Sequence, residues 1–189
     1  MSKSTEVKER IIEATISLIN ESEGDVANIS TRAIAERASV GVGMVNYHFQ
    51  TKDHLIDICV ERIIGDVISA FRPEVPGYTP LEQARHTAKL VADFLFSSPA
   101  VSRISILSDF KHPKPFDNTM KSVMGMEYTL VGQAVSEQKR HMMAFALVSV
   151  MQALFLRQEF LGCDMKVKEQ RDEMLDLLMD CLFQKEEAS

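Results

Sequence analysis

Residues 30–55 of this chain read STRAIAERASVGVGMVNYHFQTKDHL, which is two short helical patterns separated by a turn that contains glycine. Ser30 can cap the first helix, and Ala33, Ile34 and Ala38 then recur on one side of it. A turn this short makes the two helices cross steeply, so that one can lie across a DNA backbone while the other enters the major groove. The stretch therefore predicts a helix-turn-helix unit that reads DNA.

The second helix of this unit is expected from Val42 to Phe49, after a turn in which Gly41 can accept a positive φ without steric cost. Val45 and Phe49 are four residues apart and should face inward. The spacing leaves small, polar and aromatic residues on the outer surface: Gly43, Met44, Asn46, Tyr47 and His48. An amide can pair with adenine, a methyl-bearing chain can touch thymine, and Tyr, Thr and Lys can hold phosphate oxygens. We therefore predict that this helix reads the base sequence.

Residues 34–55 resemble the DNA-binding signature of the tetracycline-repressor (TetR) family of bacterial transcription regulators. Residues 8–14, KERIIEA, resemble the first helix of that family, whereas the rest of the chain is similar to it only in length and helical character. The resemblance implies an all-α protein with an N-terminal three-helix DNA-binding domain and a helical domain for ligand binding and dimerisation. We expect the DNA-binding domain in residues 1–52, a connecting helix in 53–71, and the effector-binding and dimerisation domain in 72–189.

The resemblance also implies which side chains touch DNA. The positions that match phosphate contacts of the family are Thr31, Arg32, Tyr47, His48, Thr51 and Lys52, and those that match base contacts are Gly43, Met44, Asn46 and Tyr47. The chain departs from the family at two places. Val42 stands where many relatives have a lysine, and Asn46 stands where the first of two aromatic residues is common. We therefore expect fewer phosphate contacts and an altered base preference.

The charge of the chain is unusual for a protein that binds nucleic acid. The net charge is -6, while 46% hydrophobic and 25% charged residues are typical of a soluble globular protein. Residues 1–70 contain seven Lys and Arg against eleven Asp and Glu. Three of the cations, Arg32, Arg37 and Lys52, nevertheless lie in or beside the helix-turn-helix of residues 30–55, which we call the reading unit. We expect an acidic body with a modestly basic edge, which needs two copies to bind DNA at physiological salt.

The remaining sequence predicts helices and no β-structure. Asp53 can cap the helix that follows the reading unit, Thr79 followed by Pro80 resembles a cap with proline at the first helical position, and Gly162 can end a long apolar helix. The helices are expected near residues 7–21, 53–71, 80–98, 100–110, 117–133, 137–161 and 166–184, with a proline-rich loop at 72–80 as the candidate domain boundary.

The last two expected helices are very apolar. Residues 142–156 contain only Ser149 and Gln152 as polar residues, but the run is shorter than the ~20 residues of a membrane span. A helix that is apolar on nearly all sides must be covered, either by a large internal core or by a second copy in a four-helix bundle, the dimerisation mode of the family. One short reading helix buries little surface, which favours a symmetric pair. The expected interface residues are Met151, Phe155, Leu175, Leu178 and Leu182.

Flexible apolar side chains are dense between the reading unit and these helices. Methionines and aromatic residues at helical spacing are typical of ordinary core, but the resemblance implies an effector site in this domain. The candidate pocket residues are Phe94, Phe110, Phe116, Met120, Met124 and Tyr128. A ligand that prefers one arrangement of the helices would move the helix that begins at Asp53 and release the operator.

Other chemistry has little support in the sequence. Cys59, Cys163 and Cys181 lack metal-ligand spacing and are expected to be reduced core thiols, and no glycine-rich phosphate loop or nucleophile signature occurs. No catalytic residues, cofactor or metal are expected, and the polar N-terminus is consistent with a cytoplasmic protein without a membrane partner. The sequence predicts a transcriptional regulator that binds a palindromic double-stranded DNA operator as a homodimer and is released by a small-molecule effector, repression being the common mode of the family. A small helical enzyme and a dimeric adaptor that does not bind DNA remain as alternatives.

Overall fold

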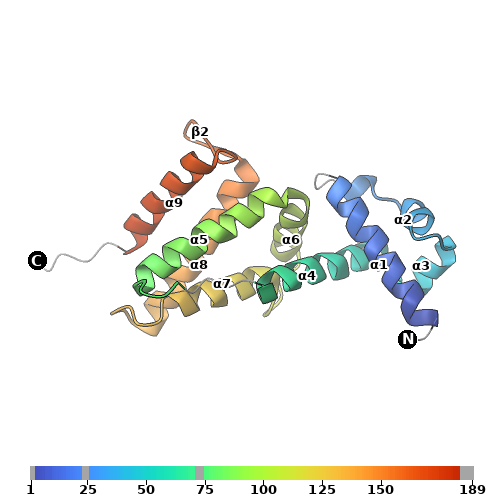
Figure 1. The fold of residues 1–189 in the computed structure, drawn as a ribbon, viewed down its shortest axis with the longest axis horizontal. Helices are drawn as coiled ribbons and strands as arrows, with labels where there is room; N and C mark the ends of the chain where they lie inside the picture. Colours follow the sequence, from blue (N-terminus) through green and yellow to red (C-terminus); the bar gives the residue numbers. More distant parts are fainter. Residues whose placement is uncertain (1–2, 23–25, 71–74, 184–189) are drawn as a thin grey trace, which may run out of the picture. The chain divides into compact units, whose positions relative to one another are not determined.

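In a computed structural model of the chain, residues 3–22, 26–70 and 75–183 are described, and they are almost entirely helical (Figure 1). The elements are α1 (Lys3–Glu21), a 3-10 helix η1 (Val26–Asn28), α2 (Thr31–Arg37), α3 (Val42–Phe49), α4 (Lys52–Ala70), α5 (Pro80–Ser97), α6 (Pro99–Lys111), α7 (Asn118–Thr129), α8 (Glu137–Arg157), β1 (Glu159–Phe160), β2 (Cys163–Asp164) and α9 (Lys168–Phe183). The predicted all-α class is confirmed. None of the helices described is by itself long and apolar enough to cross a bilayer.

The helices form two compact units. The first contains α1 to α4 together with α6, and the second contains α5 together with α7 to α9. The expected division instead assigned all of residues 72–189, and therefore α6, to one C-terminal domain. The expected boundary between residues 71 and 72 lies outside the described residues. The functional roles of the two units remain predictions.

The core of the first unit joins all five of its helices. Ile11 of α1, Ile34 of α2, Phe49 of α3, Leu55 of α4 and Val101 of α6 are almost completely buried in one cluster. Burial of such side chains contributes roughly 1.5–3 kcal/mol each, so the short helices α2 and α3 are held mainly by packing rather than by their own helix propensity. The reading unit therefore has a rigid support.

Side-chain hydrogen bonds cap the starts of α5 and α4, and the sequence predicted the first of these caps but not the second. Thr79 and Glu82 at the start of α5 form a reciprocal capping box, because the Glu82 N–H donates to Thr79 Oγ1 at 3.3 Å and the Thr79 N–H donates to the Glu82 carboxylate at 2.8 Å. This confirms the predicted cap. The cap of α4 is Thr51 and not Asp53, because the His54 N–H donates to Thr51 Oγ1 at 3.1 Å and Asp53 lies inside the helix.

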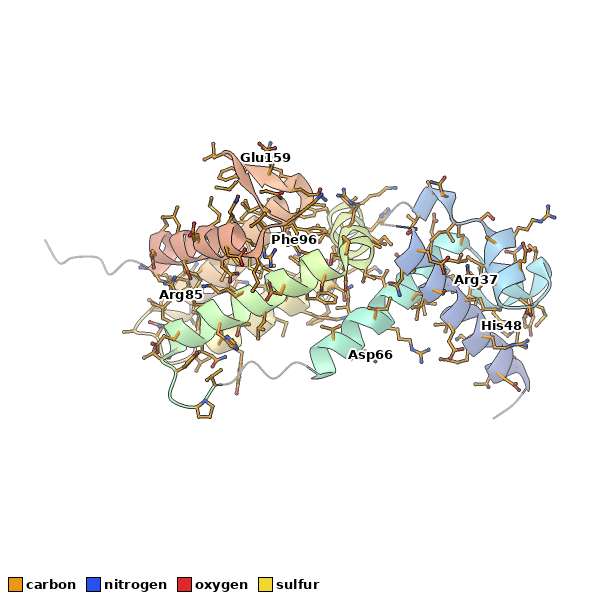
Figure 2. The ribbon with its side chains drawn as sticks, turned by 45° about the horizontal axis from the view of Figure 1, so that its top comes forward. Arg37, His48, Asp66, Arg85, Phe96 and Glu159 are labelled. Atoms are coloured by element: carbon orange, nitrogen blue, oxygen red, sulfur yellow. The ribbon has the colours of Figure 1, made fainter. Side chains whose placement is uncertain are left out.

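The core of the second unit is built around small residues on α5. Ala84, Ala88 and Ala92 recur every four residues, are buried, and pack in one cluster with apolar side chains of α7, α8 and α9. Beside this alanine stripe, Arg85 of α5 bonds to Asp176 and Asp180 of α9 at 2.8 and 2.7 Å (Figure 2). α9 is therefore attached to α5 by ion pairs as well as by apolar contacts.

The connection between α8 and α9 differs from the prediction. α8 ends at Arg157 rather than near residue 161, because Gln158 adopts a left-handed conformation with φ of 61°. A two-stranded hairpin follows, with Phe160 paired to Cys163. Leu161 and Gly162 both have positive φ, as a two-residue hairpin turn requires. The prediction that this region contains no β-structure was wrong, because strands of two residues leave no periodic signal.

Candidate nucleic-acid interface

The turn between α2 and α3 is closed by backbone hydrogen bonds. The Ala38 N–H donates to the Ile34 carbonyl at 2.9 Å, and the Val40 N–H donates to the Ala35 carbonyl at 2.9 Å. The left-handed residue is Ser39, with φ of 53°, whereas Gly41 has φ of −72° and stands as the N-cap of α3. The expectation that Gly41 takes the positive φ is therefore wrong.

The first helix of the unit begins as predicted. The Ala33 N–H donates to the Ser30 hydroxyl at 3.0 Å, which satisfies one of the unpaired N–H groups at the start of α2. Ile34 and Ala35 are buried beneath this helix. α2 is thus fixed at its start by a cap and along its length by the core.

The two faces of α3 are clearly different. Val45 and Phe49 are buried, as their spacing predicts, while Val42, Gly43, Met44, Asn46 and Tyr47 are exposed. Tyr47 has 77% of its surface exposed, and its ring contacts the His48 ring edge-on at 5.1 Å. His48, labelled in Figure 2, is half-buried, and its Nε2 has no hydrogen-bond partner among the residues described. All the predicted base-contacting side chains therefore lie on the exposed side of one short helix.

Gly43 has no reason to be glycine within the described part of the chain. Its φ is not positive, and a Cβ atom added there would meet no heavy atom within 4 Å. A helix with glycine at an interior position is about 1 kcal/mol less stable than the same helix with alanine there. The fold alone would thus favour alanine at this position, as it would at the equally open helical Gly65 and Gly125.

Four of the six predicted phosphate-contacting residues lie at the starts of helices, whereas Tyr47 and His48 lie near the end of α3. Thr31 and Arg32 open α2, Thr51 caps α4, and Lys52 begins α4. The Lys52 ammonium donates to the Val26 carbonyl at 3.1 Å, which leaves two of its three N–H bonds for an anion. Backbone N–H groups at helix starts favour anions, so this placement suits phosphate oxygens.

Arg37 does not contribute to the basic edge. It donates to both carboxylate oxygens of Glu21 at 2.7 and 2.9 Å and to the Ser17 hydroxyl at 2.7 Å (Figure 2). The hydrogen bonds from Arg37 and Ser17 lower the pKa of Glu21 to about 2. Arg37 is therefore paired within the unit. Arg32, Lys52 and Lys8, whose ammonium lies 5.8 Å from the centre of the Phe49 ring, carry positive charge near α3.

The candidate pocket residues differ in burial and are divided between the two units. Phe94 and Met120 are half-buried in the second unit, whereas Phe116, Met124 and Tyr128 are mostly exposed there. Phe110 belongs to α6 of the first unit and is also exposed. The sequence signalled apolar side chains at helical spacing, but it could not show which of them point outward.

The expected dimer residues lie mainly in the interior of the chain. Met151, Phe155 and Leu175 are buried within the second unit, with exposed fractions of 3%, 1% and 1%, while Leu178 and Leu182 are half-buried. The first three can offer a partner almost no surface. The large apolar side chains that do stand exposed on α8 and α9 are Met142, Phe145, Val150 and Leu177. Sequence reasoning missed this set because a helix that is apolar on all sides does not reveal its outer face.

The three cysteines are free thiols in different surroundings. Cys59 is in the core of the first unit, and burial raises its pKa to about 12. Cys163 is half-buried and Cys181 is exposed, so the expectation of three core thiols holds only for Cys59. Among the residues described, no group of three or more His, Cys, Asp and Glu side chains could hold a metal ion.

An exposed helix that follows a capped helix and a tight turn, all supported by α1 and α4, is the architecture of a helix-turn-helix protein. The sequence model described as "Bacterial regulatory proteins, tetR family" matches residues 11–58, which include all of α2 and α3. Over 78 residues the chain is 36% identical to the HTH-type transcriptional repressor KstR of Rhodococcus jostii (strain RHA1), which covers 41% of this chain. The matched segment spans 35% of that relative's length.

Solved structures resemble the whole chain. A TetR transcriptional regulator from Rhodococcus sp. RHA1 matches 99% of this chain and 100% of its own, with a TM-score of 0.63 and 17% identity. A second transcriptional regulator from the same organism matches 94% of this chain and 96% of its own, with a TM-score of 0.62 and 17% identity. At this identity the likeness shows the fold. The match to the tetR family of bacterial regulatory proteins is confined to residues 11–58, and the solved structures extend the likeness of the fold to the whole chain.

Proposed function

We propose that this protein is a transcriptional repressor that binds a palindromic DNA operator as a homodimer and is released by a small-molecule effector. The observation that carries the proposal is the exposed face of α3, where a glycine that the fold does not require stands beside Asn46 and Tyr47. A bare backbone at Gly43 lets the helix approach the DNA closely. Asn46 can then pair with adenine, and Met44 can touch a thymine methyl group.

The charges of the first unit indicate how strongly each copy is attracted to DNA phosphates, apart from its contacts to bases. Arg37 is occupied by Glu21, so Arg32 and Lys52 supply the cationic contacts, with the hydroxyls of Thr31, Tyr47 and Thr51 and the His48 ring as further phosphate partners. Few counterions are then released by each copy, and affinity for random DNA is low. Two copies that read half-sites roughly 34–36 Å apart, or a multiple of that distance, restore the affinity.

The homodimer has a candidate surface on the second unit. Met142, Phe145 and Val150 stand exposed on α8, and Leu177 stands exposed on α9. A two-fold interface uses the same patch on both copies, so this set would pack against itself. The wholly buried residues Met151 and Phe155 would support the interface from within.

The effector is proposed to act in the second unit by shifting a population. A ligand that prefers one packing of α5, α7 and α8 changes how often the dimer holds its reading helices at operator spacing. The half-buried Phe94 and Met120 remain candidates for ligand contact, because side chains at partial exposure can be reached from solvent.

The decisive experiment is selection of bound sequences from random double-stranded DNA with the full chain. We expect a palindromic consensus whose two halves are centred about one helical turn, or a multiple of it, apart. A consensus without two-fold symmetry would contradict the homodimer. Failure to enrich any sequence at low salt would contradict DNA reading itself.

A further inference from the structure

Gln152 is a buried amide in the most apolar helix of the chain. It lies on α8 with 6% of its surface exposed, and its Nε2 donates to the Thr119 hydroxyl of α7 at 3.0 Å. Its Oε1 is buried and has no hydrogen-bond partner among the residues described. The amide nitrogen of Gln152 therefore has a hydrogen-bond partner within the fold, whereas its amide oxygen has none among the residues described.

This arrangement lowers the stability of the fold. A buried polar group without a partner is unfavourable, because it has lost its water and gained no hydrogen bond. A methionine or leucine at the same position would fill a similar volume without that loss. Turning the amide round changes nothing, since the Thr119 hydroxyl can donate or accept and one end of the amide would still lack a partner. The fold thus accounts for the amide nitrogen of Gln152 but not for its oxygen.

The surroundings of Gln152 are apolar and aromatic. One turn along α8, the Phe155 ring meets the Phe96 ring of α5 edge-on, with 5.2 Å between the ring centres. One turn back, Val148 is buried. Met120, next to Thr119 on α7, is half-buried. The described neighbours of this polar pair along α7 and α8 are therefore apolar.

The charge that touches these rings is already neutralised. The Arg171 guanidinium lies over the Phe96 ring at 4.8 Å and donates to Asp93 Oδ1 at 2.5 Å. Arg171 also donates to the Met165 carbonyl at 3.0 Å, and it is itself buried. The Arg171 Nε has no hydrogen-bond partner among the residues described, but Asp93 already balances the charge of the guanidinium. A carboxylate ligand would add a negative charge beside this pair, which favours an uncharged ligand.

We propose that Gln152 and Thr119 form the polar end of a ligand site among α5, α7 and α8, which takes an uncharged molecule with an apolar body and a hydroxyl or amide N–H. The Gln152 oxygen accepts the ligand's hydrogen bond, so that binding satisfies the group the fold leaves unpaired. This inference rests on the proposed ligand response and names the chemical class of the effector. Neither residue is among the six candidates that the sequence suggested.

The test uses three probes of similar size on the full chain without DNA. 1-Octanol carries a donor, its isomer 1-methoxyheptane carries an oxygen that only accepts, and octanoate carries a charge. Binding is measured by calorimetry and by the shift of the Gln152 side-chain amide signals in NMR spectra. We expect 1-octanol to bind about 3- to 10-fold more tightly than the ether, the value of one hydrogen bond, and octanoate to bind more weakly than 1-octanol.

Two variants separate ligand binding from folding. Gln152→Leu should lose the preference for 1-octanol over the ether while its thermal midpoint rises by about 2–4 °C, because the unpaired amide is gone. Gln138→Leu makes the same replacement at an exposed position of α8 and should keep the wild-type preference. Equal binding of alcohol and ether by the wild type, no binding of either, or an unchanged preference in Gln152→Leu would overturn the proposal.

The operator response is a separate measurement. If 1-octanol binds through Gln152 and leaves an operator complex intact, the site stands and the proposed release by effector fails. If an operator complex is released by other compounds while 1-octanol shows no preference over its isomer, the repressor function stands and this site is refuted.

Discussion

Arg37 of α2 holds Glu21 of α1 through two parallel hydrogen bonds of 2.7 and 2.9 Å, and this pair fixes the first helix of the reading unit to its support. Paired hydrogen bonds between guanidinium and carboxylate are directional, so they set orientation as well as distance. The same pair removes one of the few positive charges near α3. While Arg37 is bound to Glu21 it supports the reading unit and is not available to a DNA phosphate.

The first prediction concerns pH. The pKa of Glu21 is about 2 in the folded chain against an ordinary value of 4.5, because Arg37 and Ser17 donate hydrogen bonds to its carboxylate. A depressed folded pKa contributes stability that is fully present above about pH 4.5 and is lost as the pH falls towards 2. As the pH falls from about 4.5 towards 2, the thermal midpoint of Glu21→Gln should therefore fall less steeply than that of the wild type. The matched variant Glu36→Gln, at an exposed position of α2, should keep the wild-type slope. Identical slopes for Glu21→Gln and wild type would contradict the role given to the pair.

The second prediction concerns Gly43. Gly43→Ala should raise the stability of the fold by up to about 1 kcal/mol, because alanine is the better helix former and the added methyl meets no atom. Operator affinity should nevertheless fall, because the methyl group would lie between α3 and the DNA. Thermal unfolding and an equilibrium DNA-binding assay measure the two effects. Gly65→Ala, at an equally open position of α4, should add stability and leave operator affinity unchanged. Unaltered affinity in Gly43→Ala would show that α3 does not approach DNA at this residue.

The third prediction concerns base specificity. Asn46 is exposed on the outer face of α3, where its amide can donate and accept at once. Asn46→Ala should relax preference at one base pair of each half-site, at a cost of roughly 1–3 kcal/mol for the preferred base. Binding to a series of operators with single base changes gives the measurement. Equal weakening across the whole series would identify Asn46 as a backbone contact instead.

The fourth prediction separates two cations. Lys52→Ala and Arg32→Ala should each flatten the dependence of log affinity on log salt by about two units, because each removes one phosphate contact from each copy of the dimer. Lys52→Ala should also lower the stability of the free protein by about 1 kcal/mol, since it loses the 3.1 Å hydrogen bond to the Val26 carbonyl. Arg32→Ala, at an exposed side chain, serves as the matched control and should leave stability almost unchanged. An unchanged salt slope in either variant would exclude that residue from the phosphate contacts.

The sequence predicted the reading unit better than it predicted the second unit, and the physical reasons differ. Ser30, Val45 and Phe49 act through local spacing and capping, so the chain itself displays their roles. In α8, by contrast, Met151 is buried and its neighbour Val150 is exposed, although both are apolar. Which of them faces the core depends on where α5, α7 and α9 lie, and that is set by contacts distant in the sequence.

The positive φ angles of Ser39 and Gln158 could not be predicted from the local sequence either. Ser39 takes the left-handed position that glycine normally favours, because the backbone bond from Val40 to Ala35 closes the turn there. Gln158 does the same at the end of α8, so that the helix ends four residues before its expected end near residue 161 and the hairpin follows. Propensity alone favours a neighbouring glycine, Gly41 or Gly162, at such places.

The last prediction concerns assembly. Phe145 stands on the outer side of α8 with 42% of its surface exposed, beside the exposed Met142 one turn back. In a two-fold dimer each substitution acts twice, so Phe145→Glu should place two carboxylates in an apolar interface and shift the protein to monomers. The matched variant Phe116→Glu changes an exposed phenylalanine outside α8 and α9 and should leave the dimer intact. Sedimentation velocity over a range of concentrations measures the shift, and thermal unfolding checks that the monomer is folded. Because a monomer can occupy only one half-site, Phe145→Glu should also lose cooperative binding to the full operator while keeping weak binding to a half-site. A Phe145→Glu protein that remains dimeric would move the interface away from this face of α8.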